Sequence, residues 1–184
     1  MKKIIFFFIF ITLIQSTEAQ EDIMLLKLKY GDVHIELYSE IAPNHVKRFK
    51  ELANSKKYDA VVFHRVIDGF MAQTGDVQYG NSKNENFNLS RAGTGGSELP
   101  NLKAEFSNLP HLRGTLSMAR ANDPDSANSQ FFICFEPAAH LDGSYTVFGK
   151  VIKGMEFIDQ IKKGEGSNGS VNDPDIIISL SSAK

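Results

Sequence analysis

The chain has one cysteine, no tryptophan and no cluster of basic residues, and each scarcity excludes something. The single cysteine, Cys134, can form neither an internal disulfide nor a cysteine zinc site, and its apolar neighbours predict burial. Basic and acidic residues nearly balance at a formal net charge of −2. We therefore expect no nucleic-acid partner, because phosphate binding needs clustered lysine and arginine.

Hydrophobic residues make up 42% of the 184 residues, which is enough for one domain with a full core. Glycine and phenylalanine each occur 14 times, and the glycines separate short apolar runs. This pattern is typical of an all-β domain with tight turns.

Residues 1–19 have the features of a secretory signal peptide. Two lysines precede an apolar run over residues 4–14, and small residues stand at the two positions that a signal peptidase reads. The run is too short to span a bilayer comfortably. We expect cleavage after Ala19, which leaves residues 20–184 as the mature domain without stable membrane insertion; the alternative is a retained signal anchor.

Periodicity predicts about eight strands and two helices, the number of strands usual for a small closed barrel that has no sheet edges. The expected helices cover residues 42–55 and 155–162. The clearest strand candidates cover residues 23–30, 33–38, 63–66, 102–106, 114–120, 130–135, 145–152 and 175–180.

Three of these elements carry detailed expectations. The first two strands form a hairpin around Gly31 and Asp32, and alternate residues from Val33 onward face the core. In the helix over residues 42–55, apolar residues recur at helical spacing, with Pro43 in the first turn. Its lysine and arginine residues are expected on the other, exposed faces.

The stretch over residues 63–76 is apolar but contains one cation, Arg65. On a strand, Phe63 and Arg65 would share one face, and His64 and Val66 the other. An arginine in such a place is usually a solvated residue or half of a weak surface ion pair. The alternative is a shallow apolar pocket with a fixed cationic donor at its rim, which suits a neutral ligand with a carbonyl or nitrogen lone pair.

Residues 77–100 read as a polar loop with a glycine-rich centre at residues 93–96. A phosphate-binding loop of the Walker type would need a following Lys-Ser/Thr pair, and Ser97-Glu98 stands there instead. The glycines can still allow a peptide to approach the backbone closely.

Several segments together resemble one family, the cyclophilins. The matching segments, in the expected order, are FHRVIDGFMAQTGD (63–76), GTGG (93–96), GTLSMARA (114–121), SQFFI (129–133) and LDGSYTVFGKV (141–151). The resemblance extends over roughly residues 23–181. It implies a closed, eight-stranded antiparallel barrel capped by two helices, with the active site on its outer wall.

The resemblance also implies roles for individual residues. Arg65 matches the catalytic arginine, and Gln73 matches the polar group that orients it. The remaining expected substrate-binding residues are Phe70, Met71, Ala119, Arg120, Phe132, His140, Leu141 and Tyr145. Ala119 and Arg120 contribute through their backbone, while Phe70, Met71, Phe132 and Leu141 form the walls of a proline pocket.

His140 stands where cyclosporin-sensitive members carry tryptophan, so weak cyclosporin inhibition is expected. No second histidine lies at ligand spacing, which argues against a metal role for His140. Tyr145 stands where many eukaryotic members have histidine. His64 precedes the arginine, and we expect it in the core or supporting the site instead of in acid–base work.

These observations predict a peptidyl-prolyl cis-trans isomerase that assists the folding of exported proteins. Its substrates would be proline-containing chains, it would need no metal or cofactor, and it would act as a monomer. The bacterial periplasm is the expected location, with the ER lumen or extracellular space as alternatives. Two other classes remain open: a peptide-docking module with little turnover, and a lipocalin-type barrel with a hollow interior. A hydrolase is not supported, because no nucleophile elbow or metal motif occurs.

Overall fold

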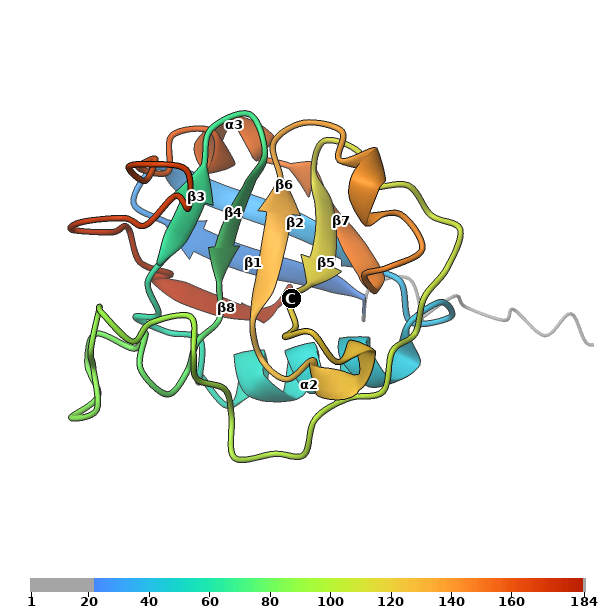
Figure 1. The fold of residues 1–184 in the computed structure, drawn as a ribbon, viewed down its shortest axis with the longest axis horizontal. Coiled ribbons are helices and arrows are strands. Elements are labelled where there is room, and N and C mark those ends of the chain that lie inside the picture. Colours follow the sequence, from blue (N-terminus) through green and yellow to red (C-terminus); the bar gives the residue numbers. More distant parts are fainter. Residues whose placement is uncertain (1–21, 184) are drawn as a thin grey trace, which may run out of the picture.

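Eight antiparallel strands form one strongly curved sheet in the computed structural model, which describes residues 22–183 (Figure 1). The strand order is β3-β4-β6-β5-β7-β2-β1-β8. The strands are β1 (Ile23–Leu28), β2 (Gly31–Leu37), β3 (Arg65–Ile67), β4 (Met71–Thr74), β5 (Thr115–Met118), β6 (Phe131–Cys134), β7 (Val147–Lys153) and β8 (Ser179–Ser182). Helices α2 (Pro43–Asn54) and α3 (Met155–Ile158) lie at opposite ends of the sheet (Figure 1).

The sheet is an open half-barrel, so the prediction of a closed barrel was wrong. Its edge strands, β3 and β8, do not pair with each other. Within residues 22–183, the segments next to these strands are joined by isolated bridges, such as Val62 with Ile176 and Arg65 with Ser170, and by single backbone hydrogen bonds, such as that from Phe63 to Asp175. Both edge strands are short, at three and four residues, and the chain next to each is irregular, so no continuous ladder forms between them. The alternation of apolar and polar residues predicts individual strands, but it does not predict whether the two edge strands of a sheet pair with each other.

The first hairpin is present, but its turn lies two residues earlier than predicted. Leu28 pairs with Gly31, so Lys29 and Tyr30 form the two-residue connection. Both turn side chains contact the carboxylate of Asp175, which fixes the tip of the hairpin. The predicted facing of the second strand is confirmed, because the alternate residues from Val33 are buried.

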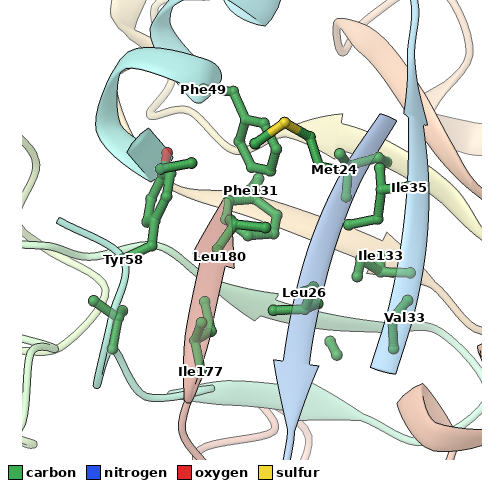
Figure 2. Packing of buried hydrophobic residues seen from close by; sticks show 14 of the residues in the cluster. Met24, Leu26, Val33, Ile35, Phe49, Tyr58, Phe131, Ile133, Ile177 and Leu180 are labelled. Atoms are coloured by element: carbon green, nitrogen blue, oxygen red, sulfur yellow. The ribbon is translucent and has the colours of Figure 1, made fainter. Parts of the chain in front are cut away.

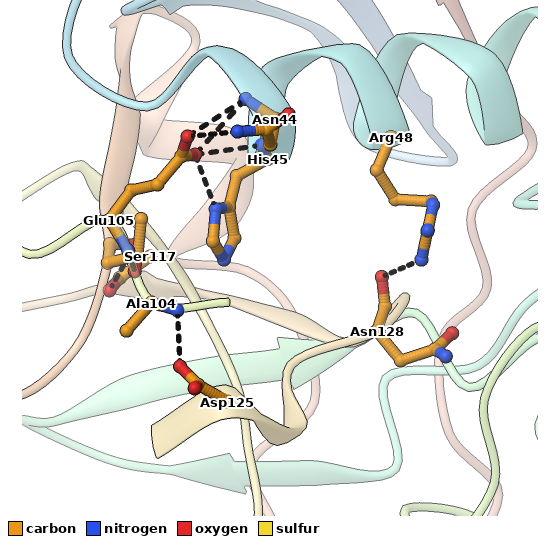
Figure 3. A network of polar contacts seen from close by, with 9 residues as sticks. Asn44, His45, Arg48, Ala104, Glu105, Ser117, Asp125 and Asn128 are labelled. Carbon is orange, nitrogen blue, oxygen red and sulfur yellow. Dashed lines mark hydrogen bonds and ion pairs between the residues drawn. The ribbon is translucent and has the colours of Figure 1, made fainter. Parts of the chain in front are cut away.

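Helix α2 matches its prediction within one residue at each end, and its apolar stripe faces the core. Figure 3 shows how its N-terminus is held: both carboxylate oxygens of Glu105 accept hydrogen bonds from the backbone and side chains of Asn44 and His45. An acidic side chain at this end satisfies free N–H groups and complements the helix dipole.

One basic residue of α2 contradicts the expectation of exposure. Arg48 is buried, and its guanidinium donates to the backbone carbonyl of Asn128 (Figure 3) and to that of Pro100. Tertiary structure explains this: the loops that contain Pro100 and Asn128 cover this face of the helix. Their carbonyls accept hydrogen bonds from the guanidinium, which offsets the cost of removing the charge from water.

Apolar side chains fill the space between the sheet and α2 (Figure 2). Phe49 of the helix contacts the rings of Tyr58, Phe131 and Phe148 at centroid distances of 5.0–5.5 Å. Strand β6 is buried along its whole length, as its continuous apolar run predicted. A filled interior of this kind argues against a lipocalin-type carrier.

Three expected elements differ from the structure. Residues 102–106 form no strand, and only Leu102 makes an isolated bridge, to Ala127. The late helix is a single turn, although Ile158 and Ile161 are buried as its spacing predicted. The last strand begins at Ser179, four residues later than expected. The predicted signal peptide lies outside residues 22–183. Within those residues, no helix has the length and apolarity needed to cross a membrane.

Candidate active site

A second apolar cluster lies on the outer face of the sheet, away from the main core. Strand alternation creates it: Phe131 and Ile133 of β6 point into the core, whereas Phe132 and Cys134 point outward. Residues on or next to β3, β4, β5 and β6, together with the segment after β6, surround a cavity of about 310 Å³. Its lining residues are Arg65, Phe70, Met71, Gln73, Ala119, Arg120, Phe132, Leu141 and Tyr145.

Arg65 is the only cation of β3, and its place at the cavity is fixed from two sides. Its Nε donates to the backbone carbonyl of Asn168 at 2.9 Å, and its Nη1 donates to Oε1 of Gln73 at 3.2 Å. Gln73 stands directly opposite Arg65 in the β3–β4 ladder. Among residues 22–183, no ion pair involves Arg65, and Nη2 has no hydrogen-bond partner.

The facing predicted for residues 63–66 was wrong. Phe63 is buried in the main core, while Arg65 points to the outer cavity. The ladder begins only at Arg65, so the preceding residues do not follow the period of a strand. Partial burial lowers the pKa of Arg65 from its ordinary value, yet a guanidinium stays protonated under any physiological condition.

Gln73 connects Arg65 to the glycine-rich loop through a residue that was not predicted as part of the site. Its Nε2 donates to Oε1 of Gln130 at 3.0 Å, and Nε2 of Gln130 donates to the carbonyl of Gly95 at 2.7 Å. Gln130 also lines an adjoining cavity of about 250 Å³ beside Gly95. The signal for Gln130 was its position two residues before Phe132, which puts both side chains on one face.

The opposite wall of the cavity is aromatic. Phe132 meets the ring of Tyr145 edge-on, with centroids 5.9 Å apart and planes at 79°. The guanidinium of Arg120 lies over the ring of Tyr145, 4.4 Å from its centroid, and donates to the carbonyl of Ser144. The Arg120 side chain thus borders the cavity, whereas only a backbone role was expected. The backbone amide of Ala119 is already engaged, because it donates to the carbonyl of Gln130.

The arrangement combines an apolar recess with a fixed donor. Comparison with known proteins shows the family of the chain. The family profile described as cyclophilin type peptidyl-prolyl cis-trans isomerase/CLD matches residues 23–182. The chain belongs to the cyclophilin family.

Relatives and solved structures agree. A probable peptidyl-prolyl cis-trans isomerase of Brucella suis biovar 1 is 54% identical over 164 residues, which cover 89% of this chain and 83% of the relative. Peptidyl-prolyl cis-trans isomerase B of Bacillus subtilis is 43% identical over 135 residues, or 72% and 85% of the two chains. This cyclophilin is therefore an isomerase of the peptidyl-prolyl cis-trans class.

Two crystal structures resemble its fold. A cyclophilin from Hirschia baltica gives a TM-score of 0.74 at 25% identity, covering 89% of this chain and 74% of that one. A cyclophilin-type isomerase from Cryptosporidium parvum, crystallised in the presence of the dipeptide Ala-Pro, gives 0.73 at 29% identity, covering 88% and 99%.

Of the residues predicted for the site of this cyclophilin, His140 alone does not line the cavity. It lies on the short turn Ala139–Leu141, exposed to solvent, with its ring 5.3 Å from that of Phe70. His140 therefore borders the site from outside, and the expected weak response to cyclosporin stays a prediction. No cluster of three or more metal-ligating side chains occurs in residues 22–183.

Cys134 and His64 are also buried near the site. Cys134 is fully buried beside Met71, and burial raises the pKa of its thiol to about 12, so it is an inert apolar residue. His64 is buried against Gly93, whose φ is +100°. A Cβ on that glycine would lie 2.9 Å from Cδ2 of His64, so the glycine permits this close approach.

Proposed function

We propose that the 310 Å³ cavity holds the ring of a substrate proline and that Arg65 drives rotation of the preceding peptide bond. The observation that carries this proposal is a charged donor with a free Nη2, fixed at the rim of an apolar recess. The recess is bounded by Phe70, Met71, Phe132 and Leu141, which offer a proline ring apolar contact on several sides.

The chemistry needs only such a donor. A peptide bond resists rotation by about 18–20 kcal/mol because its nitrogen shares a lone pair with the carbonyl. In the twisted state this lone pair localises on the proline nitrogen, and a guanidinium aimed at it binds the transition state better than the planar ground state. An Xaa-Pro bond that otherwise isomerises in tens to hundreds of seconds then rotates faster. No bond is made or broken, so the mechanism needs no nucleophile, general base, metal or cofactor.

The supporting contacts have assigned roles in this proposal. Asn168 and Gln73 hold the guanidinium in one orientation, so little ordering is needed when the substrate binds. Gln130 extends the hydrogen-bonded chain to the loop at Gly95, where the residues next to proline would lie. A docking module could use the same donor to bind a peptide carbonyl, so measured cis-trans exchange is what separates the two functions.

We expect Phe132→Leu to weaken the binding of an Ala-Pro-Phe-type peptide about tenfold, because it removes apolar wall area from the recess. Phe148→Leu is the matched control, since Phe148 is buried in the main core on β7 and does not line the cavity. Dissociation constants from NMR titration, together with cis-trans exchange rates, provide the measurement. Equal affinities in the parent protein and the Phe132 variant would count against the proline pocket.

We further infer that the enzyme works on exported proteins, most simply in a bacterial periplasm. The support is the signal-like sequence of residues 1–19 and the bacterial origin of several relatives. The full-length chain, expressed in a bacterium, is expected to yield a periplasmic protein whose first residue is Gln20. Edman sequencing of the purified protein checks this, and an intact Met1 terminus would contradict cleavage.

A further inference from the structure

A buried histidine, His111, lies under the aromatic wall of the cavity and does not line it. The His111 side chain is fully buried and its ring is nearly parallel to that of Phe132, at 14° and a centroid distance of 6.1 Å. Phe132 is therefore flanked by two rings, His111 behind it and Tyr145 beside the cavity.

Both ring nitrogens of His111 have partners. Nδ1 donates to Oδ1 of Asp142 at 2.9 Å, and the same oxygen accepts the backbone N–H of His111 at 2.8 Å. Nε2 lies 3.0 Å from Oγ of Ser117, whose hydroxyl is also 3.0 Å from the carbonyl of Thr146. An imidazole meets both demands at once, since it carries two polar atoms on one rigid plane and offers its face to a neighbouring ring.

These partners come from the segments that form the cavity. Ser117 stands directly opposite Phe132 in the β5–β6 ladder, two residues before Ala119. Asp142 immediately follows Leu141, a wall residue, and lies three residues before Tyr145. The single imidazole thus ties β5, β6 and the 141–145 segment together underneath the recess.

We propose that His111, held by Asp142, is a positioning residue that sets the orientation of Phe132 and the spacing of the walls that grip the substrate proline. The inference rests on the proline pocket of the proposed function. The series Asp142, His111 and Ser117 has the order of a nucleophilic triad, but Ser117 is completely buried, so its hydroxyl cannot meet a substrate. The series acts on the site through Phe132.

A purely structural histidine would behave differently, and the chain supplies one for comparison. His45 is also fully buried and also bonds a carboxylate, Glu105, at 2.7 Å, but it lies on α2 away from the cavity. Loss of such a residue lowers the folded fraction, which reduces the apparent rate per total enzyme and leaves the affinity of the folded molecules unchanged. Loss of a positioning residue changes the affinity itself.

The test measures peptide affinity and saturated exchange rate by NMR for His111→Ala, Asp142→Ala, Asp142→Asn and His45→Ala. We expect His111→Ala and Asp142→Ala to raise the peptide Kd about tenfold, with the exchange rate of bound peptide within about twofold of the parent, as for loss of uniform binding. Asp142→Asn is expected to restore most of the affinity, because its Oδ1 still accepts from Nδ1. His45→Ala is expected to keep the parental Kd.

The outcomes separate the possibilities. A parental Kd in both alanine variants, or in Asp142→Ala alone if His111→Ala does not fold, would overturn the positioning role; Asp142 is 38% exposed, so its variants are expected to fold. If Phe132→Leu is also without effect, the pocket assignment itself fails. If Phe132→Leu weakens binding and the two alanine variants do not, only the role of His111 is lost.

Discussion

Arg65→Ala is expected to lower kcat/KM for cis-trans exchange by about 10²–10³-fold, the loss typical when one preorganised transition-state donor is removed. The aromatic and aliphatic walls of the recess do not depend on this side chain, so peptide binding should fall much less. The guanidinium is expected to stabilise the transition state selectively, because its hydrogen bond strengthens only when the lone pair localises on the proline nitrogen. Exchange spectroscopy on a proline peptide, with affinity measured in the same titration, provides both numbers.

Arg65→Lys is the informative companion. A lysine keeps the positive charge but has one compact ammonium in place of a planar fork, so it cannot bond Asn168 and Gln73 and still present a donor to the substrate. We expect the exchange rate of the lysine variant to be at least about tenfold lower, because removal of one fixed donor typically lowers the rate by more than this. Near-parental turnover in the alanine variant would remove Arg65 from the catalytic role.

The stability of the fold should fall steeply in mild acid, chiefly because of His64. Burial lowers the pKa of this imidazole from 6.5 to about 4. Between these values the unfolded chain binds a proton that the folded protein does not, so the free energy of unfolding decreases as the pH falls. The contribution of His64 is intact above pH 6.5 and is lost by about pH 4, amounting to about 3 kcal/mol over the window.

Denaturant unfolding of the parent and of His64→Phe at several pH values tests this. The phenylalanine variant cannot take up the proton, so its stability should depend on pH less steeply, by about 1.4 kcal/mol per pH unit within the window. Burial also lowers the pKa of His45, so some acid sensitivity will persist in the variant. Identical slopes in the two proteins would show that His64 is not kept neutral by burial.

Glu105 extends the acid sensitivity to lower pH. Burial alone would raise the pKa of its carboxyl, but the hydrogen bonds from His45 and Asn44 outweigh this and hold it below the ordinary value of 4.5. The carboxylate therefore stabilises the folded state above that value, and this stabilisation is lost as the pH falls through the lowered pKa. The N-terminus of α2 then loses its acidic partner (Figure 3).

The parts of the fold that the sequence predicted are those in which a periodic pattern has one structural meaning. Helix α2 and the buried face of β2 follow directly from 3.6-residue and two-residue spacing. The failures have tertiary causes. Arg48 is buried because loops from residues 100 and 128 supply its carbonyls, and Phe63 leaves the period of β3 because the ladder starts only at Arg65.

The motifs of the sequence predicted most of the candidate site. The residues that they omit, Asn168 and His111, contact site residues only because the fold brings distant segments together. Asn168 contributes only its backbone carbonyl to the site. Every residue type has this group, so the identity of residue 168 cannot indicate its role. His111 lies in a turn before β5, where nothing in the local pattern indicates that its ring reaches Phe132. His140 shows the converse: a residue assigned to the site by its place beside a motif, where the family's tryptophan is replaced, can lie outside the cavity.

The open edge of the half-barrel leaves the orientation of Arg65 dependent on a late segment of the chain. Arg65 lies on an edge strand, and the backbone that orients it is supplied by the segment around Asn168, 103 residues further along the chain. Gly169 fits against Val66 so closely that a Cβ there would lie 2.9 Å from the Val66 carbonyl oxygen. A chain cut before Asn168 would keep every residue of the apolar walls but would lose the carbonyl that holds Nε of Arg65. A truncation of this kind would therefore separate the recess from the anchoring of its donor.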